Sequence, residues 1–304
     1  RLFDWICDGV LLVFLSVVMG YGPDIHHVFI PAEILFVLTF GIRFLVKRST
    51  ITSKFVGWSL AFLILTAISV LYANNTGMAF SRFKSVVQVL AFANLVFPYV
   101  RESETSHRRF LQIYLLAILF VGIRLALNTP LDMFLSSRLG ITIDVNPNTI
   151  GYMFVIAAII SLYLGFQSKT SRWYWLLVPV LIVLSLYTGS RKVFILLGVG
   201  VVALILLQQT SLKRAFIAAG IGVLIIGVGL VAVIAIEPLR RAFGQRLLNM
   251  FSQLSGETAD TSTSIRMGML LQGISMFKQR PIFGWGLGAF TDLSGFETYS
   301  HNNY

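Results

Sequence analysis

The chain has 304 residues, of which 56% are hydrophobic and only 12% are charged, whereas a soluble domain carries about 25% charged residues. Its formal net charge of +11 indicates, in so apolar a chain, anionic lipid and basic cytoplasmic loops rather than nucleic acid. A single cysteine, Cys7, excludes a disulfide framework within the chain. Most of the sequence is therefore expected to lie in a membrane.

Nine apolar stretches are long enough to cross a hydrocarbon layer of about 30 Å. Backbone groups in lipid must pair internally, and these stretches lack the alternation of barrel strands, so they predict helices. The predicted spans are Trp5–Met19, Phe29–Val46, Phe55–Ala73, Val86–Val100, Phe110–Leu127, Ile150–Phe166, Trp173–Tyr187, Val193–Leu207 and Ala215–Ile236. They predict an all-α, polytopic membrane bundle over residues 1–236, followed by a polar segment over residues 237–304.

Lysine and arginine in alternate loops set the expected orientation of the bundle. The basic loops, which we expect in the cytoplasm, hold Arg43, Lys47, Arg48 and Lys54; Arg101, Arg108 and Arg109; Lys169 and Arg172; and Lys213 and Arg214. The segments expected outside are Gly20–His27, Asn74–Ser85, Asn128–Thr149, Thr188–Lys192 and Glu237–Tyr304. A chain with nine spans keeps this alternation throughout.

The outer segment has a pattern of its own. Arg240–Phe251 predicts a short basic amphipathic helix, and small polar residues predict a loop over Ser252–Ser264. Apolar residues then recur near helical spacing at Ile265, Met269, Ile274 and Phe277. This spacing predicts a second helix, capped by Thr263 or Ser264. The glycines of Gly284–Gly288 follow, and because no strand precedes them they indicate a tight turn rather than a dinucleotide site.

Two adjacent cations, Arg191 and Lys192, lie in the outer turn Thr188–Lys192, where the positive-inside rule disfavours them. One interpretation is that both side chains extend to headgroup phosphates. The other is an anion site, in which Arg191 offers a bidentate fork and Lys192 a point charge. Gly189 and Ser190 would add backbone N–H groups at the start of a helix, a position that favours anions.

Arg266 and His301 are further candidates in the outer segment. Arg266 stands in a stretch of apolar and small residues, so a helix face resting on headgroups explains it less well than the arginines of Arg240–Phe251. A lone histidine is more often structural, but a pKa of about 6.5 suits His301 to accept a proton from a sugar hydroxyl. No metal-ligand spacing and no paired carboxylates accompany these residues, so we expect no metal.

In these residues the chain resembles the O-antigen ligase and polymerase superfamily of integral-membrane glycosyltransferases. The resemblance lies mainly in the second half, in Asn146-Pro147-Asn148, Gly189-Ser190-Arg191, Ser264-Ile265-Arg266, Pro281–Phe290 and His301-Asn302-Asn303-Tyr304. It implies a GT-C-like bundle in the bacterial inner membrane, with its active site on the periplasmic side, acting in lipopolysaccharide, capsule or exopolysaccharide assembly. The family continues with further spans beyond the His-Asn motif, and this chain begins with Arg1 rather than methionine, so we expect it to be incomplete at both ends.

The resemblance also implies an inverting transfer that needs neither a metal nor another cofactor. The donor would be a saccharide on undecaprenyl diphosphate, and the acceptor a growing glycan or the lipid A core. Arg191 and Arg266 would hold the diphosphate, with Lys192 as a weaker contact. His301 would position or deprotonate the acceptor hydroxyl, and Asn302 would orient that histidine or the acceptor. Polymerisation is slightly favoured over ligation or transfer to a protein.

Two other classes of function stay open from the sequence. A transporter or flippase for an anionic or lipid-linked solute would also explain outer cations, but it predicts charged or broken helices near the midplane. Few such charges are present: Glu33 and Arg124 lie toward outer ends, and Asp8 lies in the first span. A non-catalytic assembly factor is the second class, and it would tolerate the loss of His301.

Overall fold

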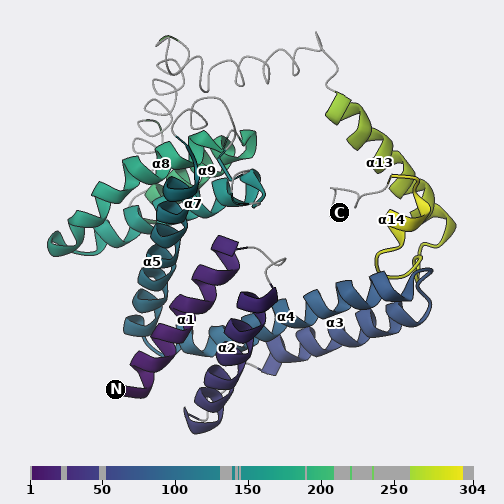
Figure 1. Cartoon of the computed structure of the whole chain (residues 1–304), viewed down its shortest axis with the longest axis horizontal. Helices are drawn as coiled ribbons and strands as arrows, with labels where there is room; N and C mark the ends of the chain where they lie inside the picture. The colour runs from purple at the N-terminus through teal and green to yellow at the C-terminus, as the bar shows by residue number, and fades with distance from the viewer. Residues whose placement is uncertain are drawn as a thin grey trace. The chain divides into compact units, whose positions relative to one another are not determined.

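The computed structural model describes residues 2–21, 26–47, 53–130, 139–140, 143, 145–188, 190–208, 220, 235 and 261–296. These described residues form helices and turns and contain no strand. In chain order the elements are α1 (Leu2–Tyr21), α2 (His26–Lys47), α3 (Ser53–Leu71), α4 (Thr76–Arg101), α5 (Glu104–Asn128), α7 (Pro147–Gln167), the 3₁₀ helix η2 (Lys169–Leu176), α8 (Leu177–Tyr187), α9 (Arg191–Gln208), α13 (Thr261–Gln279) and α14 (Ala289–Leu293) (Figure 1).

Seven helical segments of the described chain are long and apolar enough to cross a membrane, which confirms an all-α polytopic membrane protein. They are Leu2–Tyr21, His27–Lys47, Lys54–Leu71, Thr76–Arg101, Glu104–Asn128, Pro147–Gln167 and Lys169–Tyr187. The eighth predicted span corresponds to α9, in which the apolar stretch Ile195–Leu204 is shorter. The ninth predicted span, Ala215–Ile236, lies outside the described residues apart from Gly220 and Ala235, and Arg240–Phe251 lies wholly outside them.

Two predicted helix starts are wrong. Asn75 caps α4 by accepting a hydrogen bond from the Met78 backbone N–H (3.0 Å), so most of the expected loop Asn74–Ser85 is helical. The 26 residues of α4 rise about 39 Å, so its polar first turns extend beyond a hydrocarbon layer of about 30 Å. Similarly, α13 begins at Thr261, so Thr263 and Ser264 lie inside the helix rather than capping it. Hydropathy detects only the apolar part of each helix.

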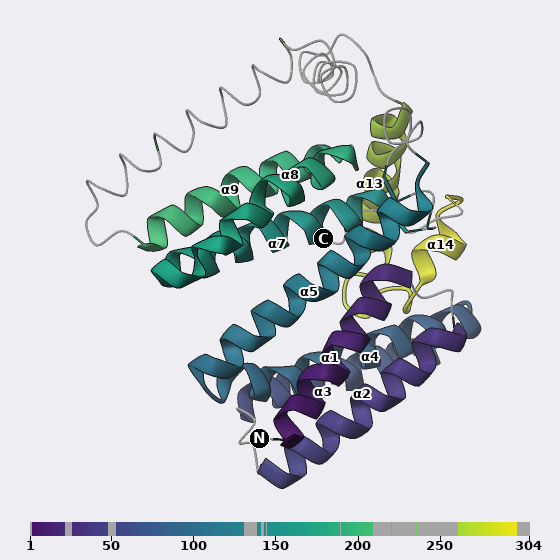
Figure 2. The same cartoon turned by 60° about the vertical axis from the view of Figure 1, so that its left-hand side comes forward.

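The chain divides into two compact units. Unit 1 comprises residues 1–39 and 103–252, and unit 2 comprises residues 40–102 and 253–304. In unit 1, α7 packs against α5, α8, α9 and η2, and α1 packs along α5 (Figures 1 and 2). Small residues make these contacts close, because Gly165 faces the Trp175 indole and Gly200 faces Ile159. Such contacts are the usual means of packing helices in lipid, where apolar burial alone provides little driving force.

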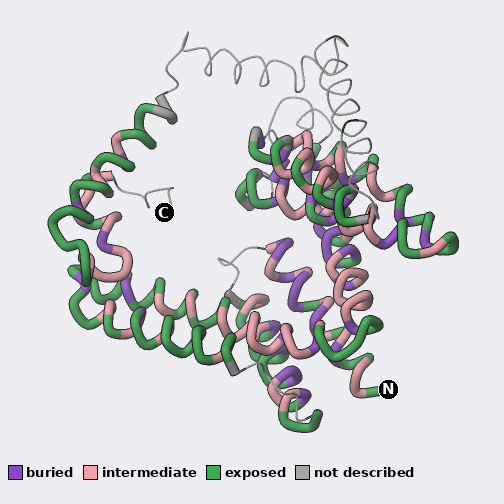
Figure 3. The backbone as a smooth tube through the Cα atoms, turned by 180° about the vertical axis from the view of Figure 1, so that it is seen from behind, coloured by how far each residue is buried: buried purple, intermediate pink, exposed green. Residues whose placement is uncertain are grey.

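Unit 2 contains the paired helices α3 and α4, which the side chains of Ser59 and Asn94 join by a hydrogen bond (3.0 Å). Figure 3 shows that exposed residues follow both helices of this pair. Many of them are large and apolar, including Trp58, Leu60 and Ile64. An apolar face of this kind is expected where lipid, rather than water, covers a helix.

Contacts within each unit join helix ends that the loop charges assign to the same side of the membrane. At the ends predicted to be cytoplasmic the pairs are Arg108–Ser171 (2.8 Å) and Lys47–Glu102 (2.8 Å); at the ends predicted to be outside they are Leu139–Tyr187 (3.0 Å) and Tyr72–Phe283 (2.5 Å). This pairing supports the alternation of the spans that the sequence predicts.

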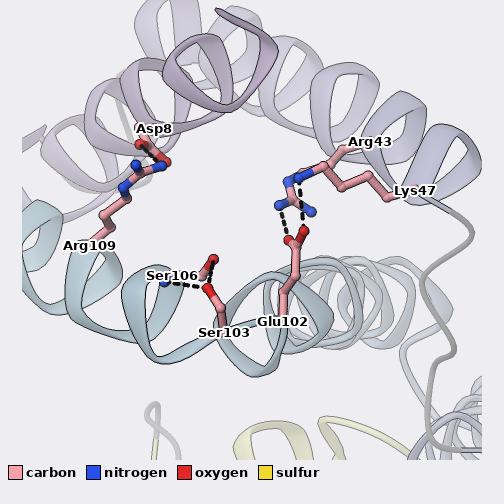
Figure 4. A network of polar contacts seen from close by, with 7 residues as sticks. All are labelled: Asp8, Arg43, Lys47, Glu102, Ser103, Ser106 and Arg109. Atoms are coloured by element: carbon pink, nitrogen blue, oxygen red, sulfur yellow. Dashed lines mark hydrogen bonds and ion pairs between the residues drawn. The ribbon is translucent and has the colours of Figure 1, made fainter. Parts of the chain in front are cut away.

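Glu102, which follows α4 in unit 2, contacts two cations of α2 (Figure 4). Arg43, which is 3% exposed, and Lys47 both donate hydrogen bonds to its carboxylate. The Arg43 guanidinium also lies 4.9 Å above the centre of the Tyr99 ring. Burial by itself would raise the pKa of Glu102, but the hydrogen bonds from Lys47 and Arg43 outweigh it and hold the pKa below its usual value.

In unit 1, Asp8 of α1 and Arg109 of α5 form a second ion pair (3.6 Å), also visible in Figure 4. The Arg109 guanidinium lies 5.8 Å above the Trp5 ring. The same end of α5 is capped by Ser103, whose hydroxyl accepts a hydrogen bond from the Ser106 backbone N–H (3.0 Å). The charge of Asp8 in the first predicted span is therefore explained by a structural contact.

We predict that Glu102→Gln destabilises the protein at pH 7. Because the folded-state pKa of Glu102 is lowered, its contribution is present above the unfolded pKa of about 4.3. The contribution is lost as the pH falls through the lowered folded-state value. The loss at pH 7 is expected to be about 1 kcal/mol, because partial exposure of Glu102 screens the pair. Unfolding in detergent at pH 7 and below pH 4 measures it.

The control for this prediction is Glu104→Gln, which removes an exposed carboxylate two residues along the chain. We expect the unfolding free energies of the two variants to differ at pH 7 and to become equal below pH 4. Equal unfolding free energies for both variants at pH 7 would contradict a stabilising role for Glu102.

Candidate functional site

The segment before α7 is a tight turn that sets the start of the helix. Gly140 adopts a φ of 110°, which favours glycine, and its carbonyl accepts a hydrogen bond from the Val145 N–H (3.1 Å). Asn146 then caps α7 by accepting from the Asn148 N–H (2.9 Å), and Pro147 occupies the first turn, where no backbone donor is needed. The motif Asn146-Pro147-Asn148 is thus the N-terminal end of α7.

The turn Thr188–Lys192 links α8 to α9. Thr188 is fully buried, and its hydroxyl donates to the Ser185 carbonyl at the end of α8 (2.6 Å). Ser190 precedes the first residue of α9, Arg191, and its carbonyl accepts from the Val193 N–H (3.2 Å). The predicted cations therefore stand in the first turn of an 18-residue helix, where unpaired backbone N–H groups and the helix dipole favour anions.

The structure brings these two segments together in unit 1. Gly151, in the first turns of α7, faces the turn so closely that an added methyl group would lie 2.6 Å from both Thr188 Oγ1 and Val193 Cγ2. The Leu139 N–H also donates to the Tyr187 carbonyl (3.0 Å), which joins the segment before α7 to the end of α8. The motifs that begin at Asn146 and at Gly189 therefore belong to one packed cluster.

The polar groups of the turn differ in their surroundings. Ser190 is 2% exposed, and its hydroxyl has no hydrogen-bond partner within the described chain. Lys192 is exposed. Gly189 and the side chain of Arg191 lie outside the described residues. A buried hydroxyl without a partner is costly, so this position favours a hydrogen-bonding ligand.

Arg266, the predicted cation of unit 2, lies on an exposed position of α13. None of the ion pairs found among the described residues involves it. Residues 261–296 hold three cations, Arg266, Lys278 and Arg280, against one carboxylate, Asp292. This segment is therefore positively charged overall, as expected of a surface that meets phosphate.

After α13 the chain turns through Gly284–Gly288 and runs back beside the helix. The Trp285 indole N–H donates to the Met276 carbonyl (3.0 Å), and the Arg280 guanidinium lies 4.1 Å above the Trp285 ring. These contacts confirm a tight turn and fix it to the end of α13. Gly284, Gly286 and Gly288 all adopt positive φ values, of 66°, 93° and 81°.

The returning segment reaches the level of Arg266. Phe296 stacks on Phe290 of α14 (6.4 Å between ring centres), and a methyl group added at Gly268 would lie 3.2 Å from its ring. Gly268 is two residues from Arg266, and His301 follows Phe296 by five residues, which span at most about 17 Å. His301 and Asn302 lie outside the described residues.

The residues predicted for the site are divided between the two units. Unit 1 holds the α8–α9 turn with Arg191, and unit 2 holds Arg266 and the chain that leads to His301. The convergence of the two parts stays a prediction.

The described residues contain no group of three or more His, Cys, Asp or Glu side chains that could hold a metal ion. Gly151 was not predicted, although a glycine one turn after a helix cap is a signal for close packing.

Residues 176–304 match a known protein family, described as O-antigen ligase. The match begins at the end of η2 and includes α8, the Thr188–Lys192 turn, α13 and the glycine-rich turn. Neither the curated proteins nor the solved structures gave a match to this chain.

We predict that Gly151→Ala destabilises the protein by about 1–3 kcal/mol, the usual range for overpacking. The added methyl group would overlap Thr188 and Val193, which are both fully buried and have little freedom to move. Unfolding in detergent measures the effect. Gly9→Ala is the matched control, because a methyl group on that helical glycine of unit 1 meets nothing within 4 Å. An equal effect of both substitutions would show that the turn is not seated against α7.

Proposed function

We propose, from the match of residues 176–304 to the O-antigen ligase family, that the protein transfers a saccharide from a lipid diphosphate to a sugar hydroxyl. The family supports a glycosyltransferase-type enzyme with lipid-linked saccharide and glycan acceptor as partners. Undecaprenyl diphosphate as the carrier, the bacterial inner membrane as the location and its periplasmic side as the site of reaction are parts of the proposal.

The observation that carries this proposal is the Thr188–Lys192 turn. It combines adjacent cations, the first turn of an apolar helix and a buried hydroxyl without a described partner. A diphosphate at this position would accept hydrogen bonds from backbone N–H groups, from Ser190 and from the bidentate fork of Arg191. Contact with Gly151 of α7 holds the turn in place before any ligand binds, so little reorganisation is needed.

In the proposed reaction the acceptor hydroxyl oxygen attacks the anomeric carbon of the donor sugar. The bond from that carbon to the diphosphate oxygen breaks, and the electron pair leaves with the diphosphate. Arg191 and Arg266 stabilise the negative charge that develops there, with Lys192 as an additional contact. A diphosphate stabilised in this way leaves without a general acid and without a bound metal.

His301 accepts the proton of the attacking hydroxyl, and Asn302 orients the histidine or the acceptor. The course of the chain supports this assignment, because the segment after the glycine-rich turn returns to Gly268, within one helical turn of Arg266 along α13. Direct attack from the face opposite the diphosphate inverts the configuration at the anomeric carbon. Chain polymerisation is slightly favoured as the overall reaction, with ligation to the lipid A core or to protein as the alternatives.

We predict that Arg191→Ala, Arg266→Ala and His301→Ala each lower the rate of transfer from a purified lipid-linked donor. The loss is expected to be about 100-fold or more for each arginine, as for other groups that stabilise transition-state charge. For His301 we expect about 10²–10⁴-fold, the range for general base catalysis. The assay uses the complete protein in detergent or bilayers.

Arg172→Ala is the control for these variants, because Arg172 lies on η2, at the end of the bundle predicted to be cytoplasmic. We expect it to transfer at the wild-type rate. Full activity of the other three variants would refute the assigned roles. Movement of the donor across the membrane without transfer would instead indicate a transporter.

We predict that chelators leave the transfer rate unchanged. The cations Arg191 and Arg266 take the part that a divalent metal has in many diphosphate-dependent transferases, since both neutralise charge on the leaving group. Transfer is measured after dialysis against EDTA and again after addition of Mg²⁺ or Mn²⁺. A loss of activity that either metal restores would contradict the proposal.

A further inference from the structure

The turn between α3 and α4, Tyr72–Asn75, contacts the glycine-rich turn Gly284–Gly288 although the two are more than 200 residues apart in the chain. The Tyr72 hydroxyl donates a hydrogen bond to the Phe283 carbonyl (2.5 Å). A methyl group added at Gly288 would meet Met78, in the first turns of α4, at 3.4 Å. Both partners belong to unit 2.

At Gly286 the contact is between two backbones. A methyl group there would lie 2.6 Å from Ala73 Cα and 3.0 Å from Ala73 N. Backbone atoms cannot turn away as the end of a long side chain can, so no side chain fits at Gly286 while the turns keep this distance. Ala73 is itself buried, which shows that the glycine-rich turn covers the end of the α3–α4 pair.

The docked turn is the point from which the returning segment starts. Trp285 and Arg280 fix the turn to α13, and the chain then runs through α14 to Phe296, beside Gly268. A shift of the turn would therefore move the whole stretch of residues 289–296 and the chain that enters His301. The α3–α4 turn is the part of the described structure that opposes such a shift from outside α13.

We propose that the α3–α4 turn is a platform that positions the returning segment for the transfer reaction, with Tyr72 and Ala73 as positioning residues. The inference rests on the proposed function and goes beyond the family match, because residues 72–75 lie outside residues 176–304. The platform acts on the rate of the chemical step. Binding of the donor diphosphate depends instead on Arg191, in the other unit, and on Arg266 of α13. Arg266 precedes Arg280, where the turn is fixed to the helix, by 14 residues.

The variants that test the platform are Gly286→Ala and Tyr72→Phe. Each has a matched control. Gly284→Ala introduces the same left-handed strain at a φ of 66°, but its methyl group meets nothing within 4 Å. Tyr163→Phe removes a hydroxyl from α7, toward the end predicted to be cytoplasmic. All four variants are made in the complete protein, and kcat and the KM for the lipid-linked donor are measured together with thermal unfolding.

We expect Gly286→Ala to lower kcat by about 100-fold, because a displacement of about 1 Å at a reacting group has effects of this size. For Tyr72→Phe, which keeps the ring and loses one hydrogen bond, we expect a loss of about 5–10-fold, equivalent to about 1 kcal/mol. The KM for the donor stays at the wild-type value in both. We expect Gly284→Ala to keep a clearly higher kcat than Gly286→Ala, and Tyr163→Phe a clearly higher kcat than Tyr72→Phe.

Three results would overturn the inference. Equal kcat for Gly286→Ala and Gly284→Ala would show that only backbone strain matters. A kcat of Tyr72→Phe equal to that of Tyr163→Phe, or an increase in donor KM with unchanged kcat, would show that the platform does not position the reacting groups. If Gly286→Ala does not fold, the comparison of kcat between Tyr72→Phe and Tyr163→Phe still tests the inference. Absence of transfer in the wild-type protein would refute the proposed function itself.

Discussion

Two close contacts at glycines hold the segments on which the proposed site depends. In unit 1, Gly151 of α7 lets the Thr188–Lys192 turn approach to a distance that no side chain would permit. In unit 2, Gly286 does the same for the docking of the glycine-rich turn on Ala73. Helices in lipid gain little from apolar burial against one another, so contacts of this kind, together with hydrogen bonds at helix ends, determine which ends meet.

The membrane also determines where chemistry on a charged donor can occur. A cation costs little free energy only near the ends of such apolar helices. The first turn of α9 adds the helix dipole and its free N–H groups to the charges of Arg191 and Lys192. A diphosphate bound there would face water on one side and a low-dielectric bundle on the other, which strengthens its interaction with the arginines. In unit 2, by contrast, the cations Arg43 and Lys47 have a structural partner, Glu102.

The sequence predicts the helices well because hydropathy over a whole span is a strong signal. It fails at the starts of α4 and α13, where polar first turns that hydropathy does not detect are helical; in α4 the Asn75 cap fixes the start. Of the candidate site, the position of Ser190 and Arg191 at a helix start and the tight turn at Gly284–Gly288 are in agreement with the structure. Both depend on local signals, namely glycine and the end of an apolar run.

The partners of these segments could not be predicted in the same way. Nothing in the residues around Gly151 or Tyr72 indicates which distant turn each one meets, because the distance is set by the packing of whole helices. Ala73 is an ordinary small residue in sequence, and only the structure shows the backbone of Gly286 against it. The pairing of α2 with the end of α4 through Glu102 belongs to the same class, since a lone glutamate in a basic loop has many possible partners.

The proposed reaction requires that one diphosphate binds both to the cationic turn Thr188–Lys192 and to Arg266 of α13. Photocrosslinking tests it most directly, with a lipid diphosphate that carries a photoreactive group beside the phosphates and the complete protein in a bilayer. We expect label in two peptides, one containing Thr188–Lys192 and one containing Arg266. Label confined to one of them, or found in the peptide that contains Arg101 and Arg109, would contradict the proposed site.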